Sequence, residues 1–392
     1  MSQAIPHGIN EHRSYVEECG YDFWLIGVTG ILVGMGLVMV ASSSIPLAHK
    51  NGYVDLYYFW RQLAAFLLGV GSGAVILRVP LAVFEKYSTV LLFLSVASLA
   101  IILIPGVGRE VNGSIRWLQF GPISLQASEP AKLAIIVYVS SYLVRHQAQV
   151  QSEFIGFIKP VGVLTIITGL LLLEPDFGAA VVIFATILGM LFLGQVPLLR
   201  FVAWGMVALA ILMSLALLAP YRLQRLMAFR DPWSDPYDSG FQLTQALIAF
   251  GRGEWFGVGL GNSIQKLFYL PEVHTDFLFA VVGEELGMLG TITVISLFLF
   301  LIWRIFFIGG LAQRAGQSFA AYLSYGIGLL IGMEAFINIG VNMGLLPTKG
   351  LTLPLMSYGS NSMLIVCVML AMVLRVAKES RVASMRGRPA YD

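Results

Sequence analysis

The sequence feature that most limits the fold is a series of long apolar stretches between residues 23 and 374. A transmembrane helix needs about 20 mostly apolar residues, and only helices or closed barrels satisfy their backbone groups in lipid. Ten stretches approach this length: 23–43, 59–77, 88–104, 129–144, 157–173, 177–194, 199–219, 277–303, 318–343 and 354–374. The sequence therefore predicts an all-α, polytopic membrane protein with about ten transmembrane helices and one large extracytoplasmic loop.

Composition supports a chain that is embedded in lipid. Hydrophobic residues make up 57% of the 392 residues and charged residues 12%, whereas soluble domains contain roughly 45–50% and about 25%. A soluble fold with this surplus would expose large apolar patches. A net charge of +2 argues against nucleic acid as a partner, because that needs a concentrated basic face. The first 22 residues are polar, so no cleavable signal peptide is expected.

The distribution of basic residues predicts the orientation, because cytoplasmic loops carry an excess of Lys and Arg. With the N-terminus inside, 13 of the 24 basic residues are cytoplasmic, and five of the others lie in one long loop that counts little. Both termini are then cytoplasmic. This predicts a tail at 1–22, a ten-span membrane domain at 23–374 and a basic tail at 375–392.

Two segments are predicted on the outer side, a short connection at 105–128 and a loop of 57 residues at 220–276. A structureless loop of that length is unusual in a compact protein unless it has a function. The loop is rich in aromatic residues and contains an apolar helical stretch, Gln242–Phe250. We expect it to fold onto the outer face of the bundle.

Asp276 is the main candidate for a catalytic residue, because it ends this loop where the eighth span begins. The helix dipole lowers the pKa of a carboxylate at a helix N-terminus, whereas partial burial raises it toward that of a general base. Glu272 and His274 are close in sequence, and His274 can tune Asp276 or hydrogen-bond to it. An N-cap acid beside an exposed histidine is the alternative interpretation.

Further charged residues lie at the predicted outer rim. Glu129 and Lys132 are three positions apart, so they share a helix face and can pair. The functional interpretation is that Lys132 and Arg116 hold an anion at the outer leaflet. The turn Glu174-Pro175-Asp176 places two acids where they can contact a cation or a sugar. A capped helix with a local ion pair and a solvated turn are the alternatives.

The ninth predicted span carries a polar stripe of Glu334, Asn338 and Asn342, which share one face because they are four residues apart. A charge in lipid is costly, so this face should point into the bundle. It forms either a wall of a polar cavity or a set of hydrogen bonds between helices. Lys349 follows at the outer rim.

No nucleotide-binding motif, His/Cys metal spacing or nucleophile elbow is present in the sequence. An enzyme of this kind must therefore use an already activated substrate, which at the outer leaflet means a lipid-linked one. No cofactor is certain. A divalent cation, Mg²⁺ or Mn²⁺, can be bound by Asp231, Asp235 and Asp238, although Asp-Pro turns explain these residues equally well.

Three long segments, 111–117, 126–132 and 250–277, closely resemble the SEDS family of peptidoglycan glycosyltransferases. The resemblance covers nearly the whole chain apart from the tails. It is closer to the division member of the family than to the elongation member, because of Gly283-Glu284-Glu285-Leu286-Gly287 and the run 261–266. The segment Ser357-Tyr358-Gly359-Ser360-Asn361-Ser362 departs from the usual Ser-Tyr-Gly-Gly-Ser-Ser, so it carries less weight as a site.

The resemblance implies an enzyme that polymerises lipid II into β-1,4 glycan strands during septal cell-wall synthesis. It implies a location in the bacterial inner membrane at the septum, among membrane lipids. The implied partners are a class B penicillin-binding transpeptidase and other division proteins. It also implies that Asp276 is the catalytic acid.

In the mechanism that this implies, Asp276 takes a proton from the 4-hydroxyl of the acceptor, the anomeric centre inverts and undecaprenyl pyrophosphate leaves. Cations should stabilise the leaving group. The candidate substrate-binding residues are Arg116, Lys132, Lys266, Lys349, Glu129, Asp176, Glu272, His274 and Asn338.

Two other functions fit the same pattern of spans. A lipid II flippase should concentrate charge through the bilayer, whereas most of the charge here gathers at the outer face. A non-catalytic division scaffold predicts that Asp276 is dispensable and that changes on helix surfaces are not.

Overall fold

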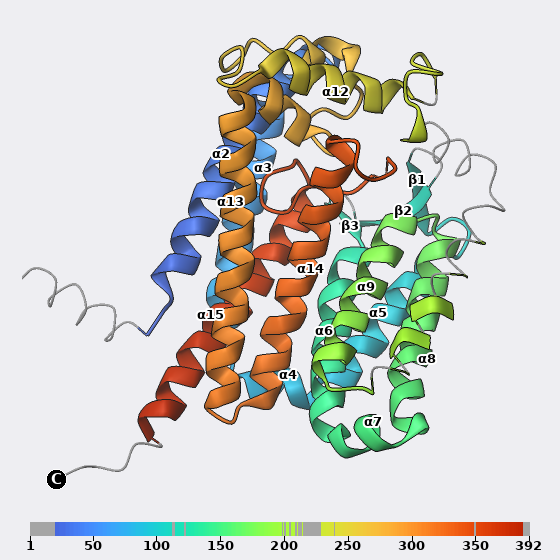
Figure 1. Ribbon diagram of the computed structural model, residues 1–392, viewed down its shortest axis with the longest axis vertical. Coiled ribbons are helices and arrows are strands. Elements are labelled where there is room, and N and C mark those ends of the chain that lie inside the picture. The colour runs from blue at the N-terminus through green and yellow to red at the C-terminus, as the bar shows by residue number, and fades with distance from the viewer. Residues whose placement is uncertain are drawn as a thin grey trace, which may run out of the picture.

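Long helices packed side by side make up most of the structure, a computed structural model (Figure 1). The residues that it describes are 20–111, 114–120, 123–197, 199, 201–203, 205–207, 210, 214, 229–238, 240–348 and 350–386. The helices are α2 (Phe23–Lys50), α3 (Tyr57–Ile76), α4 (Leu81–Lys86), α5 (Ser88–Ile102), α6 (Ser128–Arg145), α7 (Gln147–Ser152), α8 (Phe154–Leu173), α9 (Phe177–Leu193), α12 (Phe241–Gly253), α13 (Leu278–Arg314), α14 (Ser318–Asn342) and α15 (Ser360–Arg386), with a π-helical turn η1 (Gln265–Tyr269).

The connection at 105–128 contains three short strands that the sequence analysis did not predict. They are β1 (Gly108–Val111), β2 (Ser114–Phe120) and β3 (Ile123–Gln126), which form an antiparallel sheet in the order β1-β2-β3. The sheet lies at the same end of the bundle as α12 (Figure 1). It matters for the site because β2 carries Arg116.

Most predicted apolar stretches coincide with helices of the described chain, while 199–219 lies largely outside the described residues. Six described helices are long and apolar enough to cross a membrane: α2, α3, α8, α13, α14 and α15. Helices α5 and α9 are apolar but shorter, and α6 carries the charged Glu129 and Lys132. The all-α membrane fold is therefore confirmed, and the count of ten spans is not.

The two described ends of the chain lie at the same end of the bundle, opposite α12 (Figure 1). Asp22 caps α2 and pairs with Arg304 of α13 at 2.6 Å, and its carboxylate is 3.8 Å from Arg381 of α15. Helix α15 runs on to Arg386, so the predicted boundary at residue 375 falls inside a helix.

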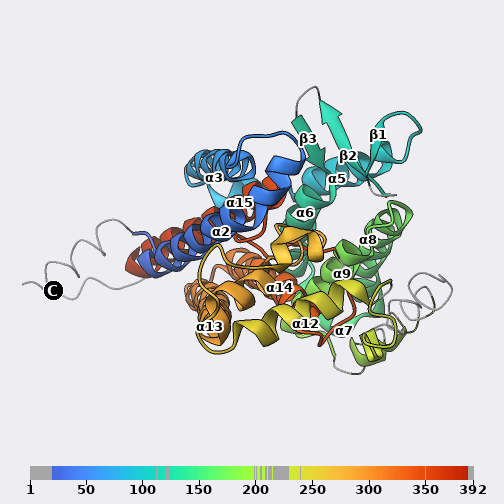
Figure 2. The ribbon, with the colours of Figure 1, turned by 90° about the horizontal axis from the view of Figure 1, so that it is seen from above.

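Helix α14 is the central helix of the bundle. Seen from above, it lies between α13 on one side and α6 and α9 on the other (Figure 2). In α14, 67% of the most apolar 18-residue stretch is buried, against 22% of the corresponding stretch in α3. Small residues allow this close approach: a Cβ at Gly326 would lie 2.7 Å from the sulfur of Met190. Polar residues on α14 are therefore shielded from lipid.

The described part of the predicted loop 220–276 folds onto one end of the bundle, the end where α12 lies. The predicted helical stretch Gln242–Phe250 lies within α12. After α12, the chain packs against α13 where that helix is interrupted at Gly287 (φ 66°, ψ −162°). The backbone N–H groups of Met288 and Leu289 donate to carbonyls of residues 254 and 255, which replaces the helical bonds lost at the break.

Two buried carboxylates hold this loop in place. Glu284 pairs with Arg252 of α12 at 2.5 Å, and Glu285 pairs with Lys266 of η1 at 2.9 Å and accepts a hydrogen bond from Ser42 of α2. Both carboxylates are at most 1% exposed. Because a buried charge is stable only when it is paired, these contacts give the loop one position.

Close packing between α12 and α13 gives the first testable expectation. A Cβ at Gly253 would collide with the carbonyl oxygen of Gly283, whereas a Cβ at Gly251 would meet nothing within 4 Å. We expect Gly253→Ala to cost about 1–3 kcal/mol through overpacking. Gly251→Ala should be neutral or stabilising by up to about 1 kcal/mol, because Ala favours helix. Thermal unfolding of the purified variants in detergent measures both, and equal melting temperatures would contradict this packing.

Candidate active site

Asp276 lies in a turn that leads directly into α13. The backbone N–H groups of Thr275 and Phe277 both donate to the carbonyl of Glu272 at 3.2 Å, and the hydroxyl of Thr275 donates to the Glu272 carboxylate at 2.8 Å. Asp276 is half-buried, one residue before the helix cap Phe277. The predicted position of a carboxylate at the start of this helix is confirmed, and the dipole favours its charge.

Two amides of α14 fix the main chain of Asp276. Nδ2 of Asn338 and Nδ2 of Asn342 each donate to the Asp276 carbonyl at 2.9 Å. Asn338 also donates to the carbonyl of Leu351, and Oδ1 of Asn342 accepts from the N–H of Ala280 at 3.0 Å. The structure thus places Asn338, a predicted substrate-binding residue, on the backbone of the Asp276 turn.

The loop after α14 brings α9 close to Asp276. A Cβ at Gly350 would lie 3.1 Å from Oδ2 of Asp276, so the backbone here is close to the carboxylate. The next residue, Leu351, packs on Gly178 at the start of α9. The predicted site residue Lys349 lies outside the described residues.

Arg116 and Asp176, which the sequence analysis placed in separate groups, meet at the start of α9. Nη2 of Arg116 donates to the carbonyl of Pro175 at 2.6 Å, and its Nη1 is 3.8 Å from Oδ1 of Asp176. Asp176 also caps α9 by accepting from the N–H of Ala179. The small sheet makes this contact possible, because it projects Arg116 from β2 toward the turn.

Glu174 is a buried acid that the sequence analysis did not select as a site residue. Its side chain is fully buried, and neither carboxyl oxygen has a hydrogen-bond partner in the described part of the chain. Nε of Arg116 is also buried without a partner there. Burial and the charge of Asp176 raise the pKa of Glu174 to about 8, against the opposing effect of Arg116. The solvated-turn alternative is therefore wrong.

Lys132 lies in a buried cluster with two acids. Its Nζ is 2.8 Å from Glu129 and 2.5 Å from Glu334 of α14, and all three side chains are at most 8% exposed. The predicted pairing of Glu129 with Lys132 is confirmed, and Glu334 completes the cluster. Because two carboxylates neutralise one ammonium group, Lys132 is not a free cation in this structure.

Lys266, another predicted cation for the substrate, is occupied in the same way. Its Nζ is paired with Glu285 and also donates to the hydroxyl of Ser42 and to the carbonyl of Gly261. Only 8% of the side chain is exposed. This geometry assigns Lys266 to holding the loop against α13 and α2.

His274 packs between two tyrosines instead of being exposed. Its ring centroid lies 5.2 Å from that of Tyr58 and 5.5 Å from that of Tyr358, and its Nδ1 has no hydrogen-bond partner among the described residues. Burial lowers the pKa of His274, opposed by the nearby Glu272, so the ring is neutral near pH 7. The ring therefore contributes a neutral aromatic surface beside Asp276.

The acids that were considered for a divalent cation lie in the turns before α12. The carbonyl of Asp235 accepts from the N–H of Gly240, and that of Asp238 from the N–H of Phe241. Within the described ranges, no three Asp, Glu, His or Cys side chains come together as a metal site. A need for Mg²⁺ or Mn²⁺ stays a prediction.

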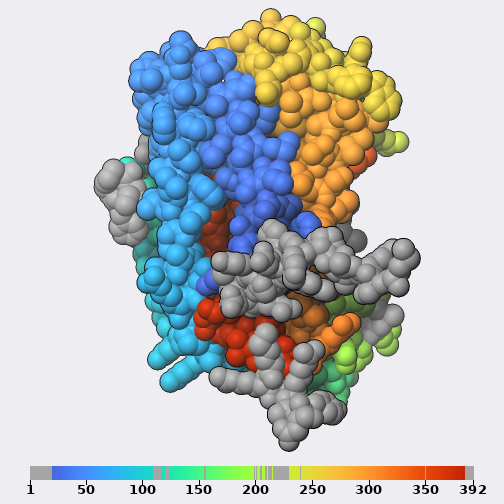
Figure 3. Space-filling model, turned by 90° about the vertical axis from the view of Figure 1, so that its left-hand side faces the viewer, coloured from blue at the N-terminus to red at the C-terminus, as the bar shows by residue number. Residues whose placement is uncertain are grey.

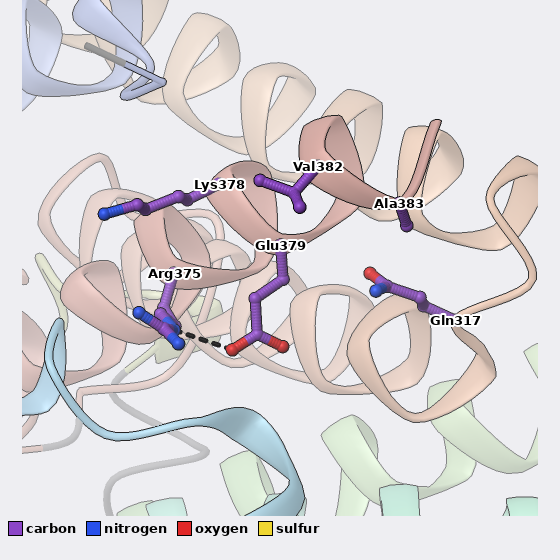
Figure 4. Close-up of a pocket in the computed structure, with 6 residues that line it drawn as sticks. All are labelled: Gln317, Arg375, Lys378, Glu379, Val382 and Ala383. Atoms are coloured by element: carbon purple, nitrogen blue, oxygen red, sulfur yellow. Dashed lines mark hydrogen bonds and ion pairs between the residues drawn. The ribbon is translucent and has the colours of Figure 1, made fainter. Parts of the chain in front are cut away.

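A pocket of about 500 Å³ opens at the other end of the bundle, between α14 and α15 (Figure 4). Arg375 donates to Glu379 across it at 2.7 Å. It lies where the described ends of the chain meet, on the opposite side from Asp276. We place the candidate active site at the opposite end, where α12 and the Asp276 turn lie. The residues that line the pocket are Gln317, Arg375, Lys378, Glu379, Val382 and Ala383.

Known proteins resemble this chain over most of its length. A family model for FtsW, RodA and SpoVE, described as cell cycle protein, matches residues 23–382. The probable peptidoglycan glycosyltransferase FtsW of Nitrosococcus halophilus is 56% identical, covering 92% of this chain and 93% of its own length. The protein of the same description from Legionella pneumophila is 50% identical over 99% of both chains.

Solved structures agree with this match. A chain reported under "structural coordination of polymerization and crosslinking by a peptidoglycan synthase complex" superposes with a TM-score of 0.76 at 28% identity, covering 92% of this chain and 98% of that one. The rod shape determining protein RodA of Thermus thermophilus gives 0.68 at 26% identity, covering 92% and 97%.

The buried carboxyl of Glu174 makes stability depend on pH. Its pKa is raised from 4.5 to about 8 in the folded chain, so the folded state holds this proton more tightly and stability falls as pH rises through that window. We expect Glu174→Gln to remove this loss, so its melting temperature should exceed that of the wild type by more at pH 8 than at pH 4.5. The exposed Glu153→Gln, at the other end of α8, is the control and should show no such trend. A constant difference across this range would contradict the assignment.

Proposed function

Because this chain belongs to the FtsW/RodA/SpoVE family of cell cycle proteins, we propose that it is a peptidoglycan glycosyltransferase that works at the outer end of its bundle. The family resemblance expected from the sequence is confirmed, and the chain is an integral membrane protein. The observation that carries the proposal is the position of Asp276. It is a half-buried carboxylate at a helix start, with its backbone held by two amides of the central helix.

The proposed reaction joins two molecules of lipid II. Asp276 takes the proton from the 4-hydroxyl of the acceptor as that oxygen attacks the anomeric carbon of the donor. The bond from this carbon to the phosphate oxygen breaks, and undecaprenyl pyrophosphate leaves with the electron pair. A single displacement inverts the centre, so an α-linked donor gives a β-1,4 link.

Arg116 is the cation best suited to the departing pyrophosphate. Lys132 and Lys266 are each in close contact with carboxylates and at most 8% exposed, whereas the side chain of Arg116 is 26% exposed and lies 3.8 Å from Asp176. A guanidinium group binds phosphate oxygens through two parallel hydrogen bonds. In a dry site, this charge stabilisation is usually the largest contribution to catalysis.

The proposed setting is the bacterial inner membrane at the division septum, with both termini cytoplasmic and the α12 end outside. The basic residues near the described chain ends support this orientation. A class B penicillin-binding transpeptidase is the proposed partner. What supports it is the similar chain from a complex that coordinates polymerization with crosslinking.

Removal of the proposed base is the direct test of activity. We expect Asp276→Asn to lower polymerisation of lipid II by about 10²–10⁴-fold, the usual contribution of general-base catalysis, without loss of folded protein. Glycan strands made from lipid II in detergent are separated on a gel, and thermal unfolding checks the fold. The exposed Glu153→Gln is the control.

Two results would contradict the proposal. One is a wild-type rate in Asp276→Asn. The other is a wild-type protein that makes no strands but moves lipid II across vesicle membranes, which would indicate the flippase.

The amide of Asn342 tests how Asp276 is positioned. We expect Asn342→Ala to lower kcat by about tenfold or more with little change in KM, because a buried hydrogen bond to the Asp276 carbonyl is lost at a cost of about 1–3 kcal/mol. Ser324→Ala, a buried position lower on the same helix, is the control. A raised KM with unchanged kcat would instead mean that Asn342 binds substrate.

A further inference from the structure

Five aromatic rings form a continuous cluster from the Asp276 turn to the protein surface. The aromatic ridge, as we name it, consists of Tyr53, Tyr57, Tyr58, His274 and Tyr358. Ring centroids are 4.2 Å apart for Tyr53 and Tyr57, 5.3 Å for Tyr57 and Tyr58, and 5.2 Å for Tyr58 and His274. Tyr53 at the outer end is 47% exposed and His274 at the inner end 8%. The ridge therefore leads from solvent to a residue two positions before Asp276.

The inner half of the ridge is rigid. The N–H of Tyr358 donates to the carbonyl of His274 at 2.9 Å. The fully buried Gln62 of α3 donates to the carbonyl of Ser357 at 2.9 Å and accepts from the N–H of Gly359 at 3.1 Å. Helix α3, the Asp276 turn and the turn before α15 are thus held together, so the rings keep one arrangement.

Polar side chains flank the rings. Nδ2 of Asn51 donates to the hydroxyl of Tyr58 at 3.0 Å, and Nη1 of Arg61 donates to the hydroxyl of Tyr57 at 3.1 Å. Both Asn51 and Arg61 are exposed, so their remaining N–H groups face solvent. The ridge combines apolar ring faces with hydrogen-bond donors at its edge.

An ordinary aromatic belt at the membrane surface differs from this arrangement. Belt residues present their rings to the headgroup region. Trp60 of α3 fits this pattern, because it is 60% exposed and, among the described residues, its ring contacts only the adjacent Phe59. The ridge instead turns inward. On the face shown in Figure 3, the upper ends of α2 and α3 (blue) lie beside the chain that precedes α13 (yellow).

We propose that the aromatic ridge binds the sugar chain of the growing glycan strand next to the reacting sugar. Pyranose rings have apolar C–H faces that stack on aromatic rings, and hydroxyl and amide edges that bond to groups such as those of Asn51 and Arg61. Binding sites combine apolar, aromatic walls with a few polar groups in this way. The ridge reaches the turn of the proposed catalytic base, so a strand on it leads directly to Asp276. This inference rests on the proposed function.

The test separates ring stacking from simple hydrophobicity at one exposed position. Tyr53→Leu keeps an apolar side chain without a ring, whereas Tyr53→Phe keeps the ring. Trp60→Leu removes an exposed aromatic ring from α3, outside the ridge. The purified full chain is titrated with soluble, lipid-free, uncrosslinked glycan oligomers by calorimetry. The lengths of strands made from lipid II are measured on gels.

We expect Tyr53→Leu to lose affinity for the oligomers at least fivefold and to make strands at least twofold shorter. Tyr53→Phe and Trp60→Leu should stay within twofold of the wild type in both measurements. Unchanged affinity in Tyr53→Leu, or an equal loss in Trp60→Leu, would overturn the proposal and indicate an interfacial belt. Because the titration needs no turnover, a wild type that binds oligomers but makes no strands would contradict the proposed function and not the ridge.

Discussion

Two hydrogen bonds from buried amides to one carbonyl hold the candidate site together. Asn338 and Asn342 lie on the central helix, where unpaired polar groups are costly, and both donate to the main chain of Asp276. One turn lower on the same helix face, Glu334 is paired with Lys132. A single polar face of α14 therefore ties the Asp276 turn to α6 across the bundle. Buried contacts alone are enough to order the turn.

The loop that ends in Asp276 would have no fixed position without a second set of contacts. The break in α13 at Gly287 exposes backbone groups that the chain after α12 satisfies, and the buried acids Glu284 and Glu285 anchor the same segment. Together with the rings beside His274, these contacts hold the chain around the half-buried carboxylate of Asp276 in one arrangement. Such preorganisation is what charge stabilisation and proton transfer in a polymerase require.

The sequence was sufficient for the features that depend on local pattern. Apolar stretches predicted the helices, the spacing of Glu129 and Lys132 predicted their pair, and the position of Asp276 followed from the start of a helix. Contacts between residues far apart in the chain could not be predicted from the sequence. Glu285 and Lys266 are 19 residues apart, with nothing in their spacing to indicate a pair. For Asn338, a wall of a polar cavity and hydrogen bonds between helices both fitted the sequence, and only the structure shows its amide bonded to backbone carbonyls.

The small sheet shows the same limit. The sequence analysis predicted only a short connection at 105–128, so the contact of Arg116 with the turn at 174–176 was unexpected. A solvated side chain was the default expectation for Glu174, because its burial depends on tertiary contacts with β2 and α9. The local sequence pattern does not reveal those contacts. Polar residues at the end of an apolar stretch, in a turn too short to reach solvent, are the signal that would have found it.

We propose that Asp276 acts on a lipid-linked sugar at the end of the bundle where α12 lies. The most direct measurement is a structure of the Asp276→Asn variant with lipid II bound. We expect the acceptor hydroxyl to lie within hydrogen-bond reach of residue 276 and the donor pyrophosphate to lie against Arg116. Lipid II bound elsewhere, with residue 276 in contact with neither sugar, would contradict it.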